Sequence, residues 1–453
     1  MAPIGFALCP KTSIFFPSSN VEERVSGNYL YANKHISKTG VIASYGGSKL
    51  MAQSTVTTTS STSVSTSSRS SERTNFGFKN LAETFWVDVQ RAEGRPLNLE
   101  LIAPLSVGSK SVEEVENVAI RVELTNGCVG WGEVPVFPSV TAVNHTVALA
   151  KAMEACEFLS CSSPMVLSLV LSEIGGILPG PELASVRAGV EMALIDAVAN
   201  SIDVPLWRLF GGVANTLTTG VTLPTVFPAE AYSQGASKYC QSGFRTFKLK
   251  IGKNTSAEIK ALQAIQAAHP LCSLILDANE AYTCQEAIEI LQKLYDSGIT
   301  PAVLEQPVHR SDWKGLGEVS NFAREKKYGI SVAVDETCQS LIEVRRVIKE
   351  NLADAINIKL AKFGVMGALE IIELARESGV KLMISGTVES RLATGFAAHL
   401  AAGLGCFKSV VLDMPFLLSE DPVICGYEAS GPVYKFLNVR GQGGFLKWDF
   451  SSW

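Results

Sequence analysis

The sequence predicts an α/β protein in which a (β/α)8-like barrel, a modified TIM barrel, follows an α+β segment. Short apolar runs alternate with helical stretches from about residue 217 to residue 412, and such alternation implies parallel strands joined by helices. A hairpin and a long helical pattern come before this region. Charged residues follow most of the apolar runs, at the end of the strands where a barrel opens onto its active-site mouth.

Residues 1–75 differ in composition from the rest of the chain. They contain no acidic residue before Glu22, and residues 51–75 are mostly serine and threonine. Such a stretch cannot bury enough apolar surface to offset its ordering entropy. An acid-poor, serine-rich leader without a compact apolar core is typical of an organelle transit peptide rather than a secretory signal. We therefore expect targeting to the chloroplast stroma, with a disordered tail that has no targeting role as the alternative.

The overall composition excludes several classes of protein. The 453 residues carry a net charge of −5 and are 47% hydrophobic and 18% charged, which predicts a folded chain of two or three domains. No basic field is present to attract nucleic acid, and no run of about 18 apolar residues suggests a membrane span. The 10 cysteines form no CxxC pair, so we expect reduced thiols rather than a disulfide scaffold.

The segment before the barrel begins with a hairpin. Val118, Ile120, Val122 and Leu124 alternate with polar residues, as in a half-buried strand. An Asn-Gly turn at residues 126–127 follows, and residues 128–133 form the return strand. Apolar residues then recur at spacings of three and four over residues 182–200, which predicts a helix.

Eight short apolar runs define the predicted barrel. Helical patterns such as residues 257–265 and 285–295 separate them, so each strand and helix forms one repeating unit. An open doubly wound sheet is the alternative, but it usually carries a glycine-rich phosphate loop, and neither GxGxxG nor GxxxxGK[ST] occurs. The runs are residues 218–222, 247–251, 274–276, 302–304, 332–334, 356–358, 382–384 and 410–412.

Acidic residues and lysines end six of the eight runs. Three consecutive runs end in carboxylates, which would repel one another at one rim unless a cation lay among them. All-oxygen ligation suits Mg²⁺, with Mn²⁺ as an alternative, whereas the five histidines lack the spacing of zinc ligands. Each residue taken alone could instead be a helix N-cap or a solvated lysine. The residues are Lys248 and Lys250, Asp277, Glu305, Asp335, Lys359 and Asp413.

This charge pattern indicates proton-transfer chemistry. A divalent ion stabilises the negative charge that forms when a proton leaves the carbon next to a carboxylate. Lysines on the second and sixth strands would lie across the barrel from each other, one on each face of a planar enolate. One could remove a proton and the other return it to the opposite face, which is the geometry of a racemase or epimerase.

Several segments together resemble the enolase superfamily, in its muconate-lactonizing subgroup, and within it the L-Ala-D/L-Glu (dipeptide) epimerases. The resemblance extends over essentially all of the chain after the leader. Its motifs are Gly-Trp-Gly-Glu at 130–133, Glu-Met-Ala-Leu-Ile-Asp at 191–196, the stretch 204–212, Lys-Leu-Lys at 248–250, Asp-Ala-Asn at 277–279, Glu-Gln-Pro at 305–307, Asp-Glu at 335–336 and Asn-Ile-Lys-Leu at 357–360.

The resemblance assigns roles to residues. It implies that Asp277, Glu305 and Asp335 bind Mg²⁺ and that Lys250 and Lys359 are the paired acid/base catalysts. Lys248 would hold the substrate carboxylate and lower the pKa of Lys250. It also implies an α+β capping domain over residues 76–215, joined by the returning segment 415–453, above a barrel over residues 216–414.

The resemblance also implies a substrate and a set of contacts to it. Dipeptide epimerases end the eighth strand with Asp-x-Asp to hold the dipeptide's ammonium, and here Val411 replaces the first acid while Asp413 remains. Lys110, in an expected capping loop after Pro104, falls where Glu-preferring relatives place a basic residue. The remaining substrate-contacting positions are Thr222, Ser385, Gly386 and Thr387.

The expected activity is therefore epimerisation at the C-terminal residue of an L-Ala-X dipeptide. Three reactions of the same family remain as alternatives: those of o-succinylbenzoate synthase, N-acylamino acid racemase and cycloisomerase. A chloroplast that makes phylloquinone needs the o-succinylbenzoate synthase reaction. A non-catalytic metal-binding descendant is an alternative of another class. The expected partner is a small-molecule dipeptide, and the sequence leaves open whether the chain forms a homo-oligomer.

Overall fold

A computed structural model describes residues 77–107, 110–137, 140–223, 229–252 and 254–448. The predicted leader, residues 1–75, lies outside this part of the chain. The side chain of Lys110 and those of its neighbours 106, 107 and 111 are also outside it. None of the helices in the described ranges is long and apolar enough to cross a membrane.

The predicted hairpin is confirmed and belongs to a three-stranded antiparallel sheet, β2 (Val89–Val107), β3 (Lys110–Leu124) and β4 (Val129–Val134). Gly127 has φ 80° at the turn, a conformation that favours glycine. The expected capping loop after Pro104 was wrong, because Leu105 pairs with Val112 and the two strands extend almost to the tip of the hairpin. Alternation in β2 is interrupted by charged residues and a proline, so the sequence pattern did not predict it.

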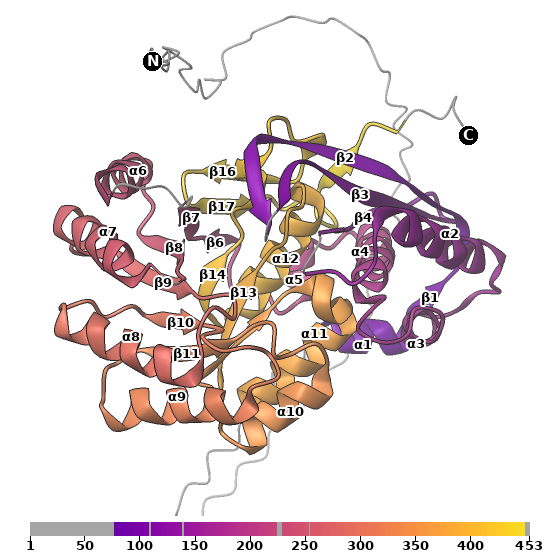
Figure 1. Ribbon diagram of the computed structural model, residues 1–453. Coiled ribbons are helices and arrows are strands. Elements are labelled where there is room, and N and C mark those ends of the chain that lie inside the picture. Colours follow the sequence, from indigo (N-terminus) through magenta and orange to yellow (C-terminus); the bar gives the residue numbers. More distant parts are fainter. Residues whose placement is uncertain (1–76, 108–109, 138–139, 224–228, 253, 449–453) are drawn as a thin grey trace, which may run out of the picture. The chain divides into compact units, whose positions relative to one another are not determined.

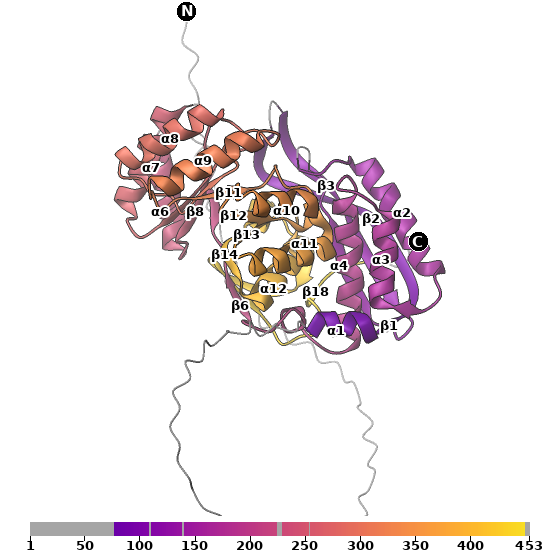
Figure 2. The same ribbon diagram turned by 90° about the horizontal axis from the view of Figure 1, so that it is seen from below.

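Helices lie along one face of this sheet (Figure 2), and its other face packs against residues near the start of α12 and in the C-terminal segment. The predicted helix is confirmed as α4 (Ala184–Ser201), and it is buried along most of its length. The neighbouring elements are α1 (Gly77–Thr84), β1 (Trp86–Val87), α2 (His145–Cys161), β5 (Met165–Val166), α3 (Leu167–Ile177) and α5 (Leu206–Leu209).

Two glycines let β4 lie directly against α4. A Cβ atom on Gly130 would lie 2.1 Å from the carbonyl oxygen of Ala193, and one on Gly132 would lie 2.0 Å from that of Gly189. Both clashes are with helix backbone, which cannot move aside without separating the strand from the helix. The Gly-x-Gly spacing therefore sets the distance between the sheet and α4.

We expect Gly130→Ala to destabilise the fold by about 3 kcal/mol, because overpacking against fixed backbone has a cost of this size. Gly176→Ala is the matched control, since a Cβ on this exposed residue of α3 meets no atom within 4 Å. That change should be neutral or stabilising by up to about 1 kcal/mol. Urea unfolding of both variants measures the difference, and equal stabilities would contradict this packing.

The predicted barrel is confirmed as eight parallel strands that neighbour one another in chain order, with helices outside them (Figure 1). The strands are β7 (Val221–Leu223), β8 (Thr246–Lys250), β9 (Ser273–Asp277), β10 (Val303–Glu305), β11 (Ser331–Val334), β12 (Ala355–Ile358), β13 (Lys381–Ser385) and β14 (Phe407–Val411). The helices are α6 (Ala229–Gln241), α7 (Thr255–Ala268), α8 (Cys284–Asp296), α9 (Trp313–Glu325), α10 (Leu341–Lys349), α11 (Leu360–Glu377) and α12 (Arg391–Leu404).

The seam between β7 and β14 closes by isolated hydrogen bonds rather than by a strand ladder. Gly220 N donates to Val410 O at 2.8 Å, and Leu412 N donates to the Thr219 hydroxyl at 2.8 Å. The single strand expected over residues 218–222 was wrong. Residues 216–218 instead form β6 (Thr216–Thr218), which pairs antiparallel with β17 (Val433–Phe436), because residues 219 and 220 belong to no strand and separate β6 from β7.

The C-terminal segment contacts the N-terminal sheet. It contains η1 (Met414–Leu417), β15 (Val423–Cys425), β16 (Tyr427–Ser430), β17 and β18 (Gly444–Leu446). The Trp448 ring packs edge-on against Trp131 of β4 at 5.1 Å, and its indole nitrogen donates to Glu93 of β2. The C-terminal segment, which follows the barrel in the chain, thus packs against the β2–β3–β4 sheet.

Two buried carboxylates of the N-terminal region hold the starts of barrel helices. Glu133 on β4 accepts hydrogen bonds from Ser390 and from Ala393 N, at the first turn of α12. Glu191 on α4 accepts from Val365 N and Met366 N, just after the Gly364 kink in α11. Carboxylates at these positions accept hydrogen bonds from helix N–H groups that have no partner within the helix. They thereby fix the loops that follow β12 and β13.

Candidate active site

The structure brings the predicted acids and lysines together at the C-terminal ends of adjacent strands. Asp277 ends β9 and Glu305 ends β10, and the two are paired in register. Asp335 follows β11 directly, and Lys359 follows β12. All three acids are buried, with at most 1% of the residue exposed. Because parallel strands end at one rim, residues far apart in the chain share one site.

Each predicted lysine is paired with a predicted acid. Lys248 Nζ bridges Asp277 Oδ2 at 2.9 Å and Glu305 Oε2 at 2.7 Å. Lys250 Nζ lies 2.8 Å from the same Asp277 oxygen, and Lys359 Nζ lies 2.5 Å from Asp335 Oδ2. Lys250 and Lys359 come from β8 and from the end of β12, with three strands between them in the barrel order.

Other groups hold the second oxygen of each acid. Asp277 Oδ1 accepts from Asn279 N at 3.1 Å. Glu305 Oε1 accepts from the Asn357 amide at 2.8 Å, and Asp335 Oδ1 accepts from Lys362 Nζ at 2.7 Å. Each acid therefore presents one oxygen toward the lysines while its other oxygen is fixed.

This donor set fits a divalent cation. Glu305 Oε2 is buried, and the contact described for it is the ion pair with Lys248 Nζ at 2.7 Å, which lacks hydrogen-bond geometry. Burial and the neighbouring charge of Asp277 raise the pKa of Glu305, as expected for an acid that lacks a sufficient counter-charge. In the ranges described here, the three acids are not yet close enough to share one metal ion, and the Lys248 ammonium lies between Asp277 and Glu305.

The acids in turn control the charge of the lysines. Burial acts to lower the pKa of Lys248, but the carboxylates of Asp277, Glu305 and Asp335 outweigh it and raise that pKa. The pKa of Lys359 is raised in the same way, mainly by Asp335 against the effect of burial. A cation bound to these carboxylates would compete for their negative charge, which acts to lower both lysine pKa values.

The predicted substrate-contacting residues form two groups. Asp413 Oδ2 accepts from Thr222 N at 2.5 Å across the barrel seam, and its Oδ1 is buried without a hydrogen bond from the described residues. On the other side of β14, Ser385 Oγ donates to Asn357 Oδ1 and the Thr387 hydroxyl donates to Glu389. Gly386 lies in this second group, where a Cβ would be 2.6 Å from Glu389 Oε1.

Sequence reasoning missed five polar residues around the site: Asn279, Glu336, Asn357, Lys362 and Glu389. Each lies within four residues of a predicted site residue. Lys362 is three residues after Lys359 in a stretch that begins a helix, so a shared helical face was a usable signal for that residue. Asn279, Glu336 and Asn357 depend on contacts between the ends of different strands, whereas Glu389 contacts Thr387 in the same loop.

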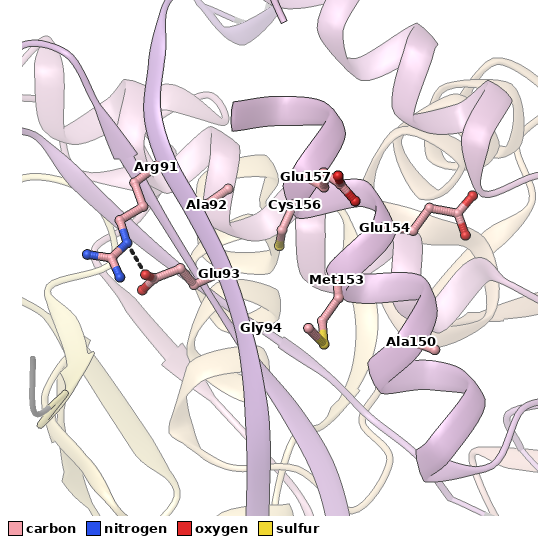
Figure 3. A pocket seen from close by; sticks show the side chains of 9 residues that line it. All are labelled: Arg91, Ala92, Glu93, Gly94, Ala150, Met153, Glu154, Cys156 and Glu157. Atoms are coloured by element: carbon pink, nitrogen blue, oxygen red, sulfur yellow. Dashed lines mark ion pairs between the residues drawn. The ribbon is translucent and has the colours of Figure 1, made fainter. Parts of the chain in front are cut away.

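An open groove lies elsewhere, between β2 and α2 (Figure 3). An Arg91–Glu93 ion pair lines one side, and Met153, Glu154 and Glu157 line the other. None of the predicted site residues is among its lining residues. The predicted acids and lysines therefore lie at the barrel mouth and not in this groove.

Comparisons with known proteins agree with this arrangement. Residues 95–211 match the mandelate racemase / muconate lactonizing enzyme N-terminal domain, and residues 231–424 match the enolase C-terminal domain-like family. An L-Ala-D/L-amino acid epimerase from Populus trichocarpa is 62% identical over 374 residues, which is 83% of this chain and 88% of that protein. The chain belongs to the mandelate racemase/muconate lactonizing enzyme family of the enolase superfamily.

Members of this family with solved structures share the fold. The substrate-liganded L-Ala-D/L-Glu epimerase from Bacillus subtilis has a TM-score of 0.74 and 29% identity, covering 79% of this chain and 99% of that chain. The dipeptide epimerase from Enterococcus faecalis V583, complexed with Mg and the dipeptide L-Leu-L-Tyr, has a TM-score of 0.70 and 26% identity. This match also covers 79% of this chain and 99% of that chain. These relatives are isomerases, so the family membership predicted from the motifs is confirmed.

Proposed function

We propose that this chain is a Mg²⁺-dependent epimerase that inverts the α-carbon of the C-terminal residue of an L-Ala-X dipeptide. The observation that carries the proposal is the placement of Lys250 and Lys359 on opposite sides of one barrel mouth, with three buried acids between them in strand order. Such a pair can serve both faces of a planar intermediate. The names of the Populus and Bacillus relatives support a dipeptide beginning with L-Ala.

The residues of the chain divide the reaction between them. One lysine takes the α-proton onto its Nζ, and the other donates a proton to the opposite face, so the substrate gains and loses one proton overall. Lys248, which already faces two carboxylates, is placed to hold the substrate carboxylate. Asp277, Glu305 and Asp335 would hold Mg²⁺. When bound, Mg²⁺ supplies positive charge that offsets the charge developing on the substrate carboxylate.

Asp413 is proposed to bind the ammonium of the dipeptide. Its Oδ1 is buried and free of hydrogen bonds from the described residues, and burial raises its pKa, so a cationic partner would stabilise its charged form. Thr222, Ser385, Gly386 and Thr387 are proposed to complete the substrate contacts, with Lys110 at the start of β3 as a further contact.

A panel of substrates in D₂O tests the proposal. We expect the protein with Mg²⁺ to incorporate deuterium into one or more L-Ala-X dipeptides, because removal of the α-proton lets a deuteron from the solvent take its place. Mass spectrometry measures the incorporated deuterium. The panel includes the o-succinylbenzoate precursor, N-acylamino acids and muconate. Turnover of one of these without exchange into any dipeptide would overturn the proposal in favour of that reaction.

We also infer that the protein acts in the chloroplast stroma. The serine- and threonine-rich, acid-poor composition of residues 1–75 supports this, as does the plant origin of the Populus relative. A fluorescent fusion of the full chain should enter chloroplasts, and a fusion that begins at residue 76 should stay in the cytosol. Equal distribution of the two fusions would contradict the inference.

A further inference from the structure

The two proposed catalytic lysines differ in how the protein holds them. The Lys359 side chain is 12% exposed, whereas that of Lys250 is 46% exposed. Lys250 has two partners in the described part of the chain, Asp277 Oδ2 at 2.8 Å and Asn279 Oδ1 at 2.5 Å. Because Asp277 is a proposed Mg²⁺ ligand, Asn279 is the partner that stays with Lys250 when that carboxylate serves the cation.

Asn279 is itself held in an unusual conformation. Its φ is 40°, in the left-handed region that asparagine tolerates better than most residues. Its main-chain N–H donates to Asp277 Oδ1 at 3.1 Å, and its side-chain amide donates to Glu336 Oε1 at 2.9 Å. The side chain therefore links Lys250 on β8 to Glu336 just after β11.

The chemistry of these groups sets the orientation of the amide. A lysine ammonium only donates, and an ionised carboxylate only accepts. The Asn279 amide therefore satisfies both neighbours in one orientation, with its oxygen toward Lys250 and its nitrogen toward Glu336. Without Glu336, nothing in the described hydrogen bonds of Asn279 would stop the amide from turning its nitrogen toward the ammonium.

We propose that Glu336 and Asn279 form a positioning pair that orients Lys250 through hydrogen bonds and does not position Lys359. The proposal rests on the proposed two-lysine function. Lys359 has a separate arrangement, since it contacts Asp335, whose other oxygen is held by Lys362. The Glu336 charge also acts to raise the pKa of Lys359, but the described hydrogen bonds of the pair reach Lys250 and not Lys359. The pair thus positions the proton-transfer group on one face of the substrate only.

Exchange of each epimer in D₂O tests this separation. Each lysine removes the α-proton of one epimer. The epimer whose exchange is lost in Lys250→Ala is the one served by Lys250, and Lys359→Ala identifies the other in the same way. In Asn279→Ala and Glu336→Ala, exchange of the epimer served by Lys250 should fall about 10- to 100-fold, the effect of misplacing a reacting group by about 1 Å. Exchange of the epimer served by Lys359 should stay within about threefold of wild type.

A conservative variant separates positioning from loss of fold. Glu336→Gln keeps a side-chain oxygen that accepts from the Asn279 amide, so it should recover most of the exchange lost in Glu336→Ala. A uniform loss with both epimers, or no recovery in Glu336→Gln, would overturn the positioning pair. If wild type exchanges neither epimer of any dipeptide, the proposed function fails instead, so the two failures are distinguishable.

Discussion

Replacing Lys359 with alanine should abolish epimerisation while exchange of one epimer with solvent continues. The variant lacks one of two proton carriers, so inversion should fall about 10³- to 10⁴-fold, within the range of a lost general acid or base. Lys250 remains and still removes and returns the α-proton on its own face. The fold should persist because Asp335 keeps its ion pair with Lys362 at 2.7 Å. Chiral chromatography measures inversion, and mass spectrometry measures exchange.

Lys250→Ala should give the mirror result, with exchange confined to the other epimer. Asp277 would then keep its pair with Lys248. Lys381→Ala is the matched control, because Lys381 begins β13 at the opposite end of the barrel and donates to Ser331 at 2.7 Å. Normal epimerisation by either catalytic variant, or a defect in the control as large as theirs, would contradict the two-lysine mechanism.

Asp335→Asn should remove the response of the protein to Mg²⁺. Wild type should be stabilised by about 2.7 kcal/mol at a Mg²⁺ concentration 100 times the Kd, and chelation should stop turnover. The variant should gain nothing from Mg²⁺ and should itself lose about 3–5 kcal/mol, because Lys359 and Lys362 would be left buried without their shared counter-charge. Thermal unfolding with and without Mg²⁺ measures both effects.

The neighbouring acid provides the control. Glu336 follows Asp335 in the chain but contacts Asn279, and it is not one of the three proposed ligands. Glu336→Gln should therefore keep the Mg²⁺-dependent stabilisation. Loss of that stabilisation in Glu336→Gln, with retention in Asp335→Asn, would show that the ligand set has been assigned to the wrong residue.

The barrel and its acids were predictable because their signals are local. Six of the eight predicted strands are short apolar runs that end in a charged residue, as at Asp277 and Glu305, and most runs are followed by a helical period. Burial on both sides of a parallel strand requires such runs. Strand ends share one rim in any barrel, so the meeting of the acids followed from the order of the strands alone.

Other features depend on contacts that no local pattern contains. The pairing of β6 with β17 joins residues more than 200 positions apart in the chain, and it removed part of the expected first barrel strand. The Asn279–Glu336 contact likewise joins the ends of β9 and β11. Both residues lie in motifs of the family resemblance, but the sequence does not show that they contact each other, and an asparagine or a second acid after a strand is also ordinary helix-capping chemistry.

The position of deuterium after inversion is the most direct measurement of the two-lysine account. Each epimer of the L-Ala-X dipeptide that is turned over fastest is incubated separately in D₂O with the protein and Mg²⁺, and the products are analysed by NMR and chiral chromatography. We predict that both epimers reach the same final mixture and that inverted molecules carry deuterium at the α-carbon of the C-terminal residue. Inversion that retains the original proton, or deuterium at the N-terminal alanine instead, would contradict the two-lysine mechanism.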